Sequence, residues 1–159
     1  MEKNPVNCVV GVLFAFTVLA ASGVFAAEKM ASLPKNFRSW THTKSTVIAD
    51  KSHPLYGFHN QYANVGALKT LKSGGTYKDG AVFVDSLHEV EVKDGIQTVG
   101  KKMAALVMIK DMKADKTGGW IFAKFGPDGK AMQIDQVKDC FECHTPVKDS
   151  DFVFQKYID

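Results

Sequence analysis

The fold is decided by residues 77–111, YKDGAVFVDSLHEVEVKDGIQTVGKKMAALVMIKD. A Lys-Asp-Gly turn at 78–80 precedes a run rich in β-branched residues, and a second Lys-Asp-Gly turn at 93–95 leads into another such run. An Asp-Gly pair between two such runs is a strong local signal for a β-hairpin. Successive side chains of a strand point to opposite faces. We therefore expect Ala81, Phe83, Asp85 and Leu87 on one face and Val82, Val84, Ser86 and His88 on the other.

The flanking segments extend this hairpin. "KTGGWIFAKFGPDGK" (116–130) predicts a third strand from Trp120 to Phe125, closed by a Gly-Pro-Asp-Gly turn. Upstream, 58–65 predicts an extended segment, and 66–75 predicts a short helix ended by two glycines. The mixed segment 41–58 contains Pro54 and is expected to loop over the surface.

The two ends of the chain are expected to be helical. "PKNFRSW" (34–40) predicts a short helical turn, and "MQIDQVKDCFECH" (132–144) has helical spacing with Asp135 as a candidate N-cap. Pro146 is expected to end that last helix. The predicted fold class is mainly β (α+β), an antiparallel sheet meander with short helices at the N-terminus and at the C-terminal segment.

The N-terminal sequence predicts a targeting signal. Residues 1–26 carry Lys3 near their start, are apolar from about Cys8 to Ala20, and end in Val24-Phe25-Ala26, which fits a small-x-small cleavage site. The alternative is an uncleaved anchor, but the apolar run is short for a membrane span of about 20 residues. We expect residues 1–26 to be a signal peptide and residues 27–159 a single exported domain.

Composition argues against nucleic acid as a partner. The chain has 159 residues with 20 Lys and Arg against 17 Asp and Glu, a formal net charge of only +3. It has no basic cluster interleaved with aromatic residues. We therefore expect a small-molecule or protein partner.

The chemistry concentrates in "KDCFECHTPVKD" (138–149). Cys-x-x-Cys-His is the attachment motif of a c-type haem: on a helix the three residues share a face, so two thiols reach the vinyl groups and the histidine reaches the iron. Zinc would normally need a second ligand pair, which the sequence lacks. A disulfide across two residues would constrain little chain, and a thioredoxin-type pair normally follows a strand in a βαβ unit. We expect one covalent haem c, held by Cys140 and Cys143, with His144 on the iron.

The position of the Cys-x-x-Cys-His motif in the chain limits which residues could be the sixth ligand of the haem iron. Only fifteen residues follow His144, and none is methionine or histidine. A sixth ligand must therefore come from upstream, with Met108 as a candidate that shares a face with Leu106. Methionine ligation would raise the reduction potential, whereas an open position would admit small ligands.

Three stretches within residues 34–157 share the pattern of a known family: "YANVGALKTLKSGGTYKDGAVFVDSL", "GGWIFAKF" and "CFECHTPVKDSDFVFQKY". Together they resemble the cytochrome P-460 and cytochrome c′-beta family. The resemblance implies a β-sheet haem domain, commonly a homodimer. One branch of the family has a lysine linked to the haem and oxidises hydroxylamine; the other lacks the link and binds nitric oxide or related gases at five-coordinate iron.

Matched to the family's pattern, Asp85 stands where the crosslinking lysine belongs, and Leu106 where an acidic pocket glutamate does. His59 falls at a position that can hold a distal arginine. An Asp85–His59 pair near an open iron would support proton transfer, which makes both candidate catalytic residues. Phe58 and Phe83 could cap the iron; the alternative is that both are ordinary core residues.

Taken together, the sequence predicts a periplasmic haem protein that binds nitric oxide, carbon monoxide or a related small ligand, and so binds or detoxifies reactive nitrogen species. A hydroxylamine-oxidising or peroxidase-like enzyme remains an alternative. A second alternative is an electron-transfer cytochrome with a methionine ligand. A redox partner cytochrome and a homodimer are also expected.

Overall fold

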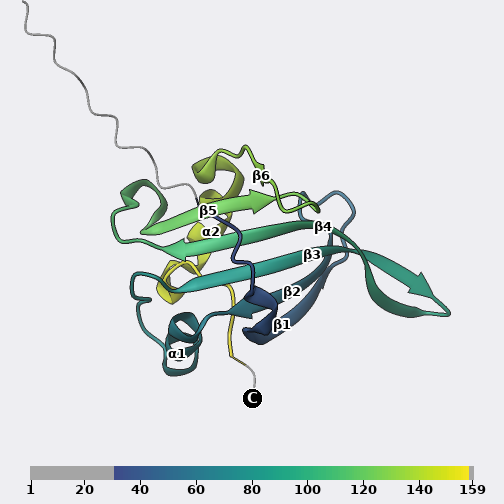
Figure 1. Ribbon diagram of the computed structural model, residues 1–159, viewed down its shortest axis with the longest axis horizontal. Helices are drawn as coiled ribbons and strands as arrows, with labels where there is room; N and C mark the ends of the chain where they lie inside the picture. The colour runs from purple at the N-terminus through teal and green to yellow at the C-terminus, as the bar shows by residue number, and fades with distance from the viewer. Residues whose placement is uncertain (1–30, 158–159) are drawn as a thin grey trace, which may run out of the picture.

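The computed structural model describes residues 31–157 (Figure 1). The predicted signal peptide at residues 1–26 lies outside the described residues. Six strands form one antiparallel sheet in chain order, which confirms the predicted meander. The strands are β1 (Thr41–Ile48), β2 (Gly57–Ala63), β3 (Val82–Lys93), β4 (Ile96–Lys110), β5 (Trp120–Phe125) and β6 (Ala131–Met132). No helix in the described part of the chain is long and apolar enough to cross a membrane.

The helices are short and lie at the ends of the strands. They are η1 (Phe37–Ser39), α1 (Val65–Ser73), η2 (Asp115–Thr117), η3 (Gln136–Phe141), α2 (Glu142–His144) and η4 (Thr145–Ser150). Helix α1 begins where Asn64 accepts a hydrogen bond from the backbone N–H of Ala67, and it ends at Gly74. These bounds match the helix expected at 66–75 to within a few residues.

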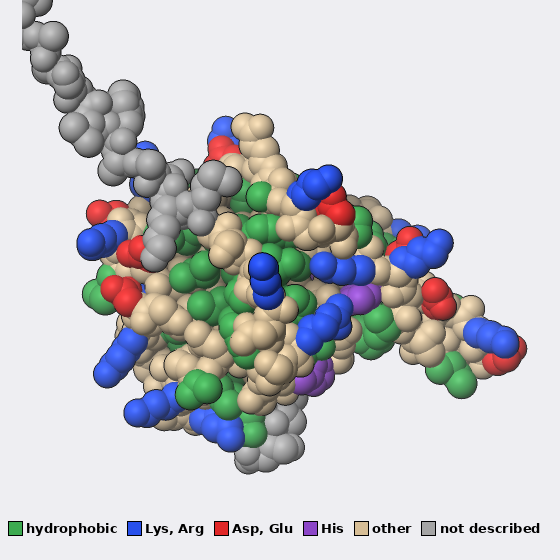
Figure 2. Space-filling model, in the orientation of Figure 1, with side chains coloured by type: hydrophobic (Ala, Val, Ile, Leu, Met, Phe, Trp, Pro, Cys, Tyr) green, Lys and Arg blue, Asp and Glu red, His purple; other side chains and the backbone are tan. Residues whose placement is uncertain are grey.

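The β3–β4 hairpin has the turn that the sequence predicts. Asp94 and Gly95 both have positive φ, at 52° and 79°, as a type I′ turn requires. The register of the pair shifts between Leu87 and Val90, and the hairpin projects well beyond the rest of the sheet (Figure 1). Figure 2 shows apolar side chains beside acidic and basic ones on this projecting arm.

Strand β1 corrects one expectation. Residues 41–48 were expected to loop over the surface, but they form an edge strand paired with β2, with Lys44 opposite Gln61 and Thr46 opposite His59. Thr43, a polar residue, is the only buried residue of β1, so the apolar alternation of this strand is weak. Pro54 lies in the loop that follows.

The sheet has a different core on each face, as the alternation in β3 predicts. Phe83 belongs to the cluster on one face and Val84 to the cluster on the other. The first cluster contains Ala63, Ala67, Tyr77, Ala81, Phe83, Trp120, Phe122 and Val153. The second contains Phe37, Val84, Ala105, Val107 and Phe125. We call the face that bears the first cluster the haem face, because the C-terminal segment with the cysteines packs on it.

The C-terminal segment is helical from residue 136 to residue 150, with three successive helix types. Asp135 is the N-cap, as predicted: its side chain accepts from the backbone N–H groups of Val137 and Lys138. The first part is a π-helix, then one α-helical turn carries His144, and a 3-10 helix follows. Pro146 was expected to end the helix. It lies instead in the first turn of the 3-10 helix, where its missing N–H is not needed.

Candidate haem-binding site

His144 lies over the haem face in an orientation set by one hydrogen bond. Its Nδ1 donates to the carbonyl of Phe152 at 2.7 Å, which leaves Nε2 without a proton and available as a ligand. The imidazole ring packs between Phe122 and Phe154, with ring centroids 5.1 and 5.0 Å away. Burial lowers the pKa of His144, although the hydrogen bond to Phe152 opposes this. Burial thus favours the neutral imidazole that a metal requires.

The two cysteines are free thiols on the same segment. Cys140 is half-buried against the core of the haem face, and Cys143 is exposed. Burial, together with the nearby Asp139 and Cys143, raises the pKa of Cys140 to about 11, and Lys124 opposes this only partly. A thiol with so high a pKa is protonated at neutral pH and is a poor redox nucleophile, which argues against a thioredoxin-type role.

The residues present fit a haem better than a bare metal ion. No group of three or more His, Cys, Asp or Glu side chains within residues 31–157 could hold a metal ion. His144 alone cannot hold a bare metal ion. It therefore suits an iron whose other ligands are supplied by a porphyrin. The helical segment 136–150, which carries His144, is anchored to the sheet at its start, since Gln136 Oε1 accepts from the backbone N–H of Phe122 at 2.7 Å.

On the same face of the sheet, the buried His59 pairs with Asp85, which is partly buried. His59 is 3% exposed, and its Nδ1 lies 2.8 Å from Asp85 Oδ2. Its Nε2 lies 2.8 Å from the carbonyl of Leu55, which can only accept, so Nε2 carries a proton. The pair then holds one further proton, on His59 or on Asp85. Burial disfavours the charged ring, but the hydrogen bond and charge of Asp85 outweigh burial and raise the pKa of His59 above 6.5.

Three buried oxygen atoms on this side of the sheet lack a hydrogen-bond partner among the described residues. They are Asp85 Oδ1, Gln61 Oε1 and Thr46 Oγ1. Asp85 and Gln61 are opposite each other on β3 and β2, and Gln61 Nε2 donates to Asp85 Oδ2 at 3.3 Å. Buried acceptors without partners are rare in folded proteins. Here they offer hydrogen-bond acceptors to a ligand or to water.

The other histidines are not placed to ligate the iron. Both ring nitrogens of His59 are engaged, as described above. His88 is only 8% exposed, with Nε2 bonded to Ser86 and Nδ1 to the Gly100 carbonyl. It lies on the face opposite Asp85, as the strand alternation dictates. His42 and His53 bond to their own loop or strand neighbours at the surface.

Of the two phenylalanines predicted to cap the iron, only one lies on the haem face. Phe83 packs there against Tyr77 and Trp120. Phe58 is paired with His88 and alternates with His59, so it points to the opposite face. The prediction that Phe58 contributes to the haem pocket is therefore corrected. Met108 is half-buried on the haem face, opposite Phe83 and Phe122, and packs against that core.

Sequence reasoning missed the contacts that hold the turn after His144. Lys110 and Asp151 form an ion pair of 2.7 Å in which both side chains are largely buried. The two residues are 41 positions apart. The only available signal was a lysine at the end of an apolar strand, next to the Gly-Gly-Trp sequence.

An antiparallel meander that carries Cys-x-x-Cys-His on a short helix, against a face with one prepared histidine, defines a β-sheet cytochrome. Comparison with protein families agrees. The chain belongs to the Cytochrome P460 family, whose profile matches residues 34–155, nearly the whole described chain. It is therefore a haem protein of a small-ligand-binding class. No curated protein matches the sequence.

Proposed function

We propose that the protein is a periplasmic monohaem c-type cytochrome that binds nitric oxide or a related small ligand. Cys140 and Cys143 hold the haem covalently, and His144 Nε2 binds the iron. The haem supplies an iron centre that coordinates small nitrogen oxides. The role that follows is the binding or detoxification of reactive nitrogen species.

One observation carries this proposal. Of the five histidines, His144 is the only one on the haem face that bonds a backbone carbonyl through Nδ1 and keeps Nε2 available as a ligand. The remaining histidines are engaged or lie elsewhere. With one histidine ligand, the opposite side of the iron stays open unless a methionine occupies it. Met108 packs among aromatic side chains in the core, which is the common role of methionine.

Optical and ligand-binding spectra of the purified haem-loaded protein test this directly. We expect a high-spin ferrous form that takes up both carbon monoxide and nitric oxide. A low-spin form with a sulfur-to-iron charge-transfer band, insensitive to carbon monoxide, would instead support the electron-transfer alternative. Met108→Leu separates the two cases: it leaves the spectrum unchanged if the position is open and converts low spin to high spin if Met108 is the ligand.

A second candidate function is favoured by the His59–Asp85 pair. The pair holds a proton that it can transfer, and Asp85 Oδ1 is a buried acceptor without a partner among the described residues. Such a face suits a ligand that carries N–H or O–H groups, such as hydroxylamine or hydrogen peroxide. Chemistry of this kind would make the protein an enzyme.

The variants His59→Leu and Asp85→Asn test the second candidate. We expect both to slow the turnover of hydroxylamine with an electron acceptor, or the reaction with peroxide. Carbon monoxide carries no proton, so its association rate is the internal control and should change little. Unchanged hydroxylamine and peroxide rates in both variants would leave gas binding as the single proposed function.

Location and assembly complete the proposal. Export is supported by the leader-like residues 1–26, and homodimer formation by the family resemblance. Expression of the full chain in a periplasm-containing host should yield a protein that begins at Ala27, as N-terminal sequencing would show. Sedimentation of the haem-loaded protein should give twice the mass of one chain, and a single-chain mass would contradict the dimer.

A further inference from the structure

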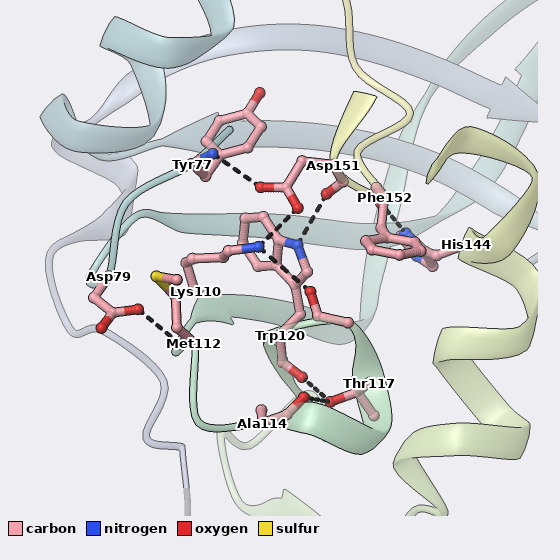
Figure 3. Close-up of polar contacts among 11 residues, drawn as sticks. Tyr77, Asp79, Lys110, Met112, Ala114, Thr117, Trp120, His144, Asp151 and Phe152 are labelled. Carbon is pink, nitrogen blue, oxygen red and sulfur yellow. Dashed lines mark hydrogen bonds and ion pairs between the residues drawn. The ribbon is translucent and has the colours of Figure 1, made fainter. Parts of the chain in front are cut away.

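The turn after the haem-attachment segment is held to the sheet through Asp151 (Figure 3). Asp151 Oδ1 accepts from Lys110 Nζ at 2.7 Å, and Oδ2 accepts from the backbone N–H of Tyr77 at 2.8 Å. Its backbone carbonyl accepts from Trp120 Nε1 at 2.9 Å. The three donors come from the end of β4, the segment before β3 and the start of β5. Every oxygen of Asp151 is therefore fixed by the sheet.

The next residue, Phe152, provides the carbonyl that accepts from His144 Nδ1. Asp151 and Phe152 both have left-handed backbone conformations, with φ of 51° and 63°. A bulky residue rarely adopts this conformation, and it persists only where the surroundings impose it. The Phe152 N–H bonds to the Val147 carbonyl at 3.1 Å, whereas the contacts that join the turn to the sheet come from Asp151.

Lys110 is the charged member of this arrangement. Its side chain is only 4% exposed, and its ammonium contacts Asp151, the Gly118 carbonyl at 3.4 Å and the face of the Trp120 ring at 4.9 Å. A buried ammonium is stable only when it is paired. Burial and the negative charge of Asp151 raise the pKa of Tyr77 to about 12, so the tyrosine stays neutral beside the pair.

The two glycines before Trp120 make room for this arrangement. A Cβ atom on Gly119 would lie 3.2 Å from Lys110 Nζ. A Cβ atom on Gly118 would lie 2.5 Å from the Phe152 ring. The Gly-Gly-Trp sequence therefore shapes the space in which the ion pair and the Phe152 turn meet.

We propose that Lys110 is a positioning residue for His144: through Asp151 it holds the Phe152 carbonyl against His144 Nδ1–H. The proposal rests on the proposed function, because it takes His144 as the iron ligand. A hydrogen bond to the second nitrogen of a ligating histidine fixes its orientation and raises its basicity. Weakening that bond makes His144 a weaker donor, which lowers the iron–histidine stretching frequency and raises the reduction potential.

The test uses the haem-loaded protein and three variants. Lys110→Met removes the ammonium with little change in shape. Asp151→Asn removes the charge of the acceptor while keeping a residue that tolerates the left-handed conformation. The double variant Lys110→Met/Asp151→Asn leaves no buried charge unpaired, so it remains measurable if either single variant fails to fold. The readouts are the iron–histidine stretching frequency from resonance Raman spectra of the ferrous protein and the reduction potential.

Two controls separate positioning from general loss of stability. Lys130→Met removes an exposed ion pair with Asp128, whose side chains are 86% and 53% exposed. Val107→Ala opens a cavity on the opposite face of the sheet, so it destabilises the fold without contacting Asp151. Neither control should move the stretching frequency or the potential.

We expect every Lys110 and Asp151 variant to show a lower stretching frequency and a higher potential than the wild type. Unchanged values in the double variant, or an equal shift in Val107→Ala, would overturn the proposal and leave Lys110 with a purely structural role. Failure of the proposed function is recognised separately. In that case the wild-type ferrous protein itself shows no iron–histidine band, whatever the variants do.

Discussion

Replacing Gly118 by Ala should place a methyl group against Phe141, which lies within the haem-attachment segment, and Phe152, which lies in the turn after it. The new Cβ would lie 2.5 and 2.8 Å from atoms of the Phe152 ring and 2.9 Å from the Phe141 ring. Gly118 also has a left-handed conformation, with φ of 64°. The substitution therefore introduces both steric overlap and backbone strain.

The expected loss of stability is the sum of these two costs. Overpacking of a filled core costs about 1–3 kcal/mol, and a left-handed L-residue costs about 1–2 kcal/mol. The free energy of unfolding should therefore fall by about 2–5 kcal/mol. For a domain of this size, 1 kcal/mol corresponds to about 4 °C in Tm, so we expect a decrease of about 8–20 °C.

Thermal unfolding of the haem-loaded protein measures this effect, with Gly95→Ala as the matched control. Gly95 has a similar φ of 79°, but nothing lies within 4 Å of its added Cβ. The control should lose only the backbone cost, about 4–8 °C. Equal losses in the two variants would refute the argument that the Phe141 and Phe152 rings fill the space above Gly118.

Three further predictions concern the His59–Asp85 pair, the contact of Trp120 with the Asp151 turn, and the haem-attachment cysteines. Because the pKa of His59 is raised in the folded protein, its pairing with Asp85 stabilises the fold fully below the unfolded pKa of about 6.5, and that stabilisation is lost as pH rises through the folded pKa. Urea unfolding across this pH range should show the loss, and Asp85→Asn should remove it. Trp120→Phe leaves the Asp151 carbonyl without its donor and should lower the free energy of unfolding, measured in urea, by about 2–3 kcal/mol. Cys143→Ser should still retain haem after denaturation through the remaining thioether, as a pyridine haemochrome spectrum of the denatured protein would show.

The central strands could be predicted from sequence because their signals are local. The Asp94-Gly95 turn, the alternation through Phe83 and Asp85, and the strand from Trp120 all depend on residues close together in the chain. Strand β1 could not be predicted in the same way. Its residues are mostly polar and half-exposed, and an edge strand of this kind is recognised only from its partner.

In the candidate site, too, the features with a local sequence signal could be predicted and those that depend on the fold could not. The Cys-x-x-Cys-His sequence is a local motif, so its position was evident. Phe58 was misplaced because its face depends on the register between β2 and β3, and a shift of one residue reverses every side chain. The contact between Lys110 and Asp151 is formed by the fold alone, since neither residue carries a local signal for the other.

The His59–Asp85 pair could be predicted only in part. The family resemblance placed His59 and Asp85 near the cofactor, and the structure brings them within hydrogen-bonding distance at 2.8 Å. The resemblance supplied the positions, whereas only the structure showed that Leu55 occupies the second nitrogen of His59. That contact determines where the protons are, and hence which chemistry the pair can support.

The most direct test of the account is the intact mass of the chain produced with a working c-type haem maturation system. We predict one species that carries a single haem on the peptide containing Cys140 and Cys143, and that keeps it under denaturing conditions. Recovery of the chain with both thiols unmodified would contradict the account at its foundation.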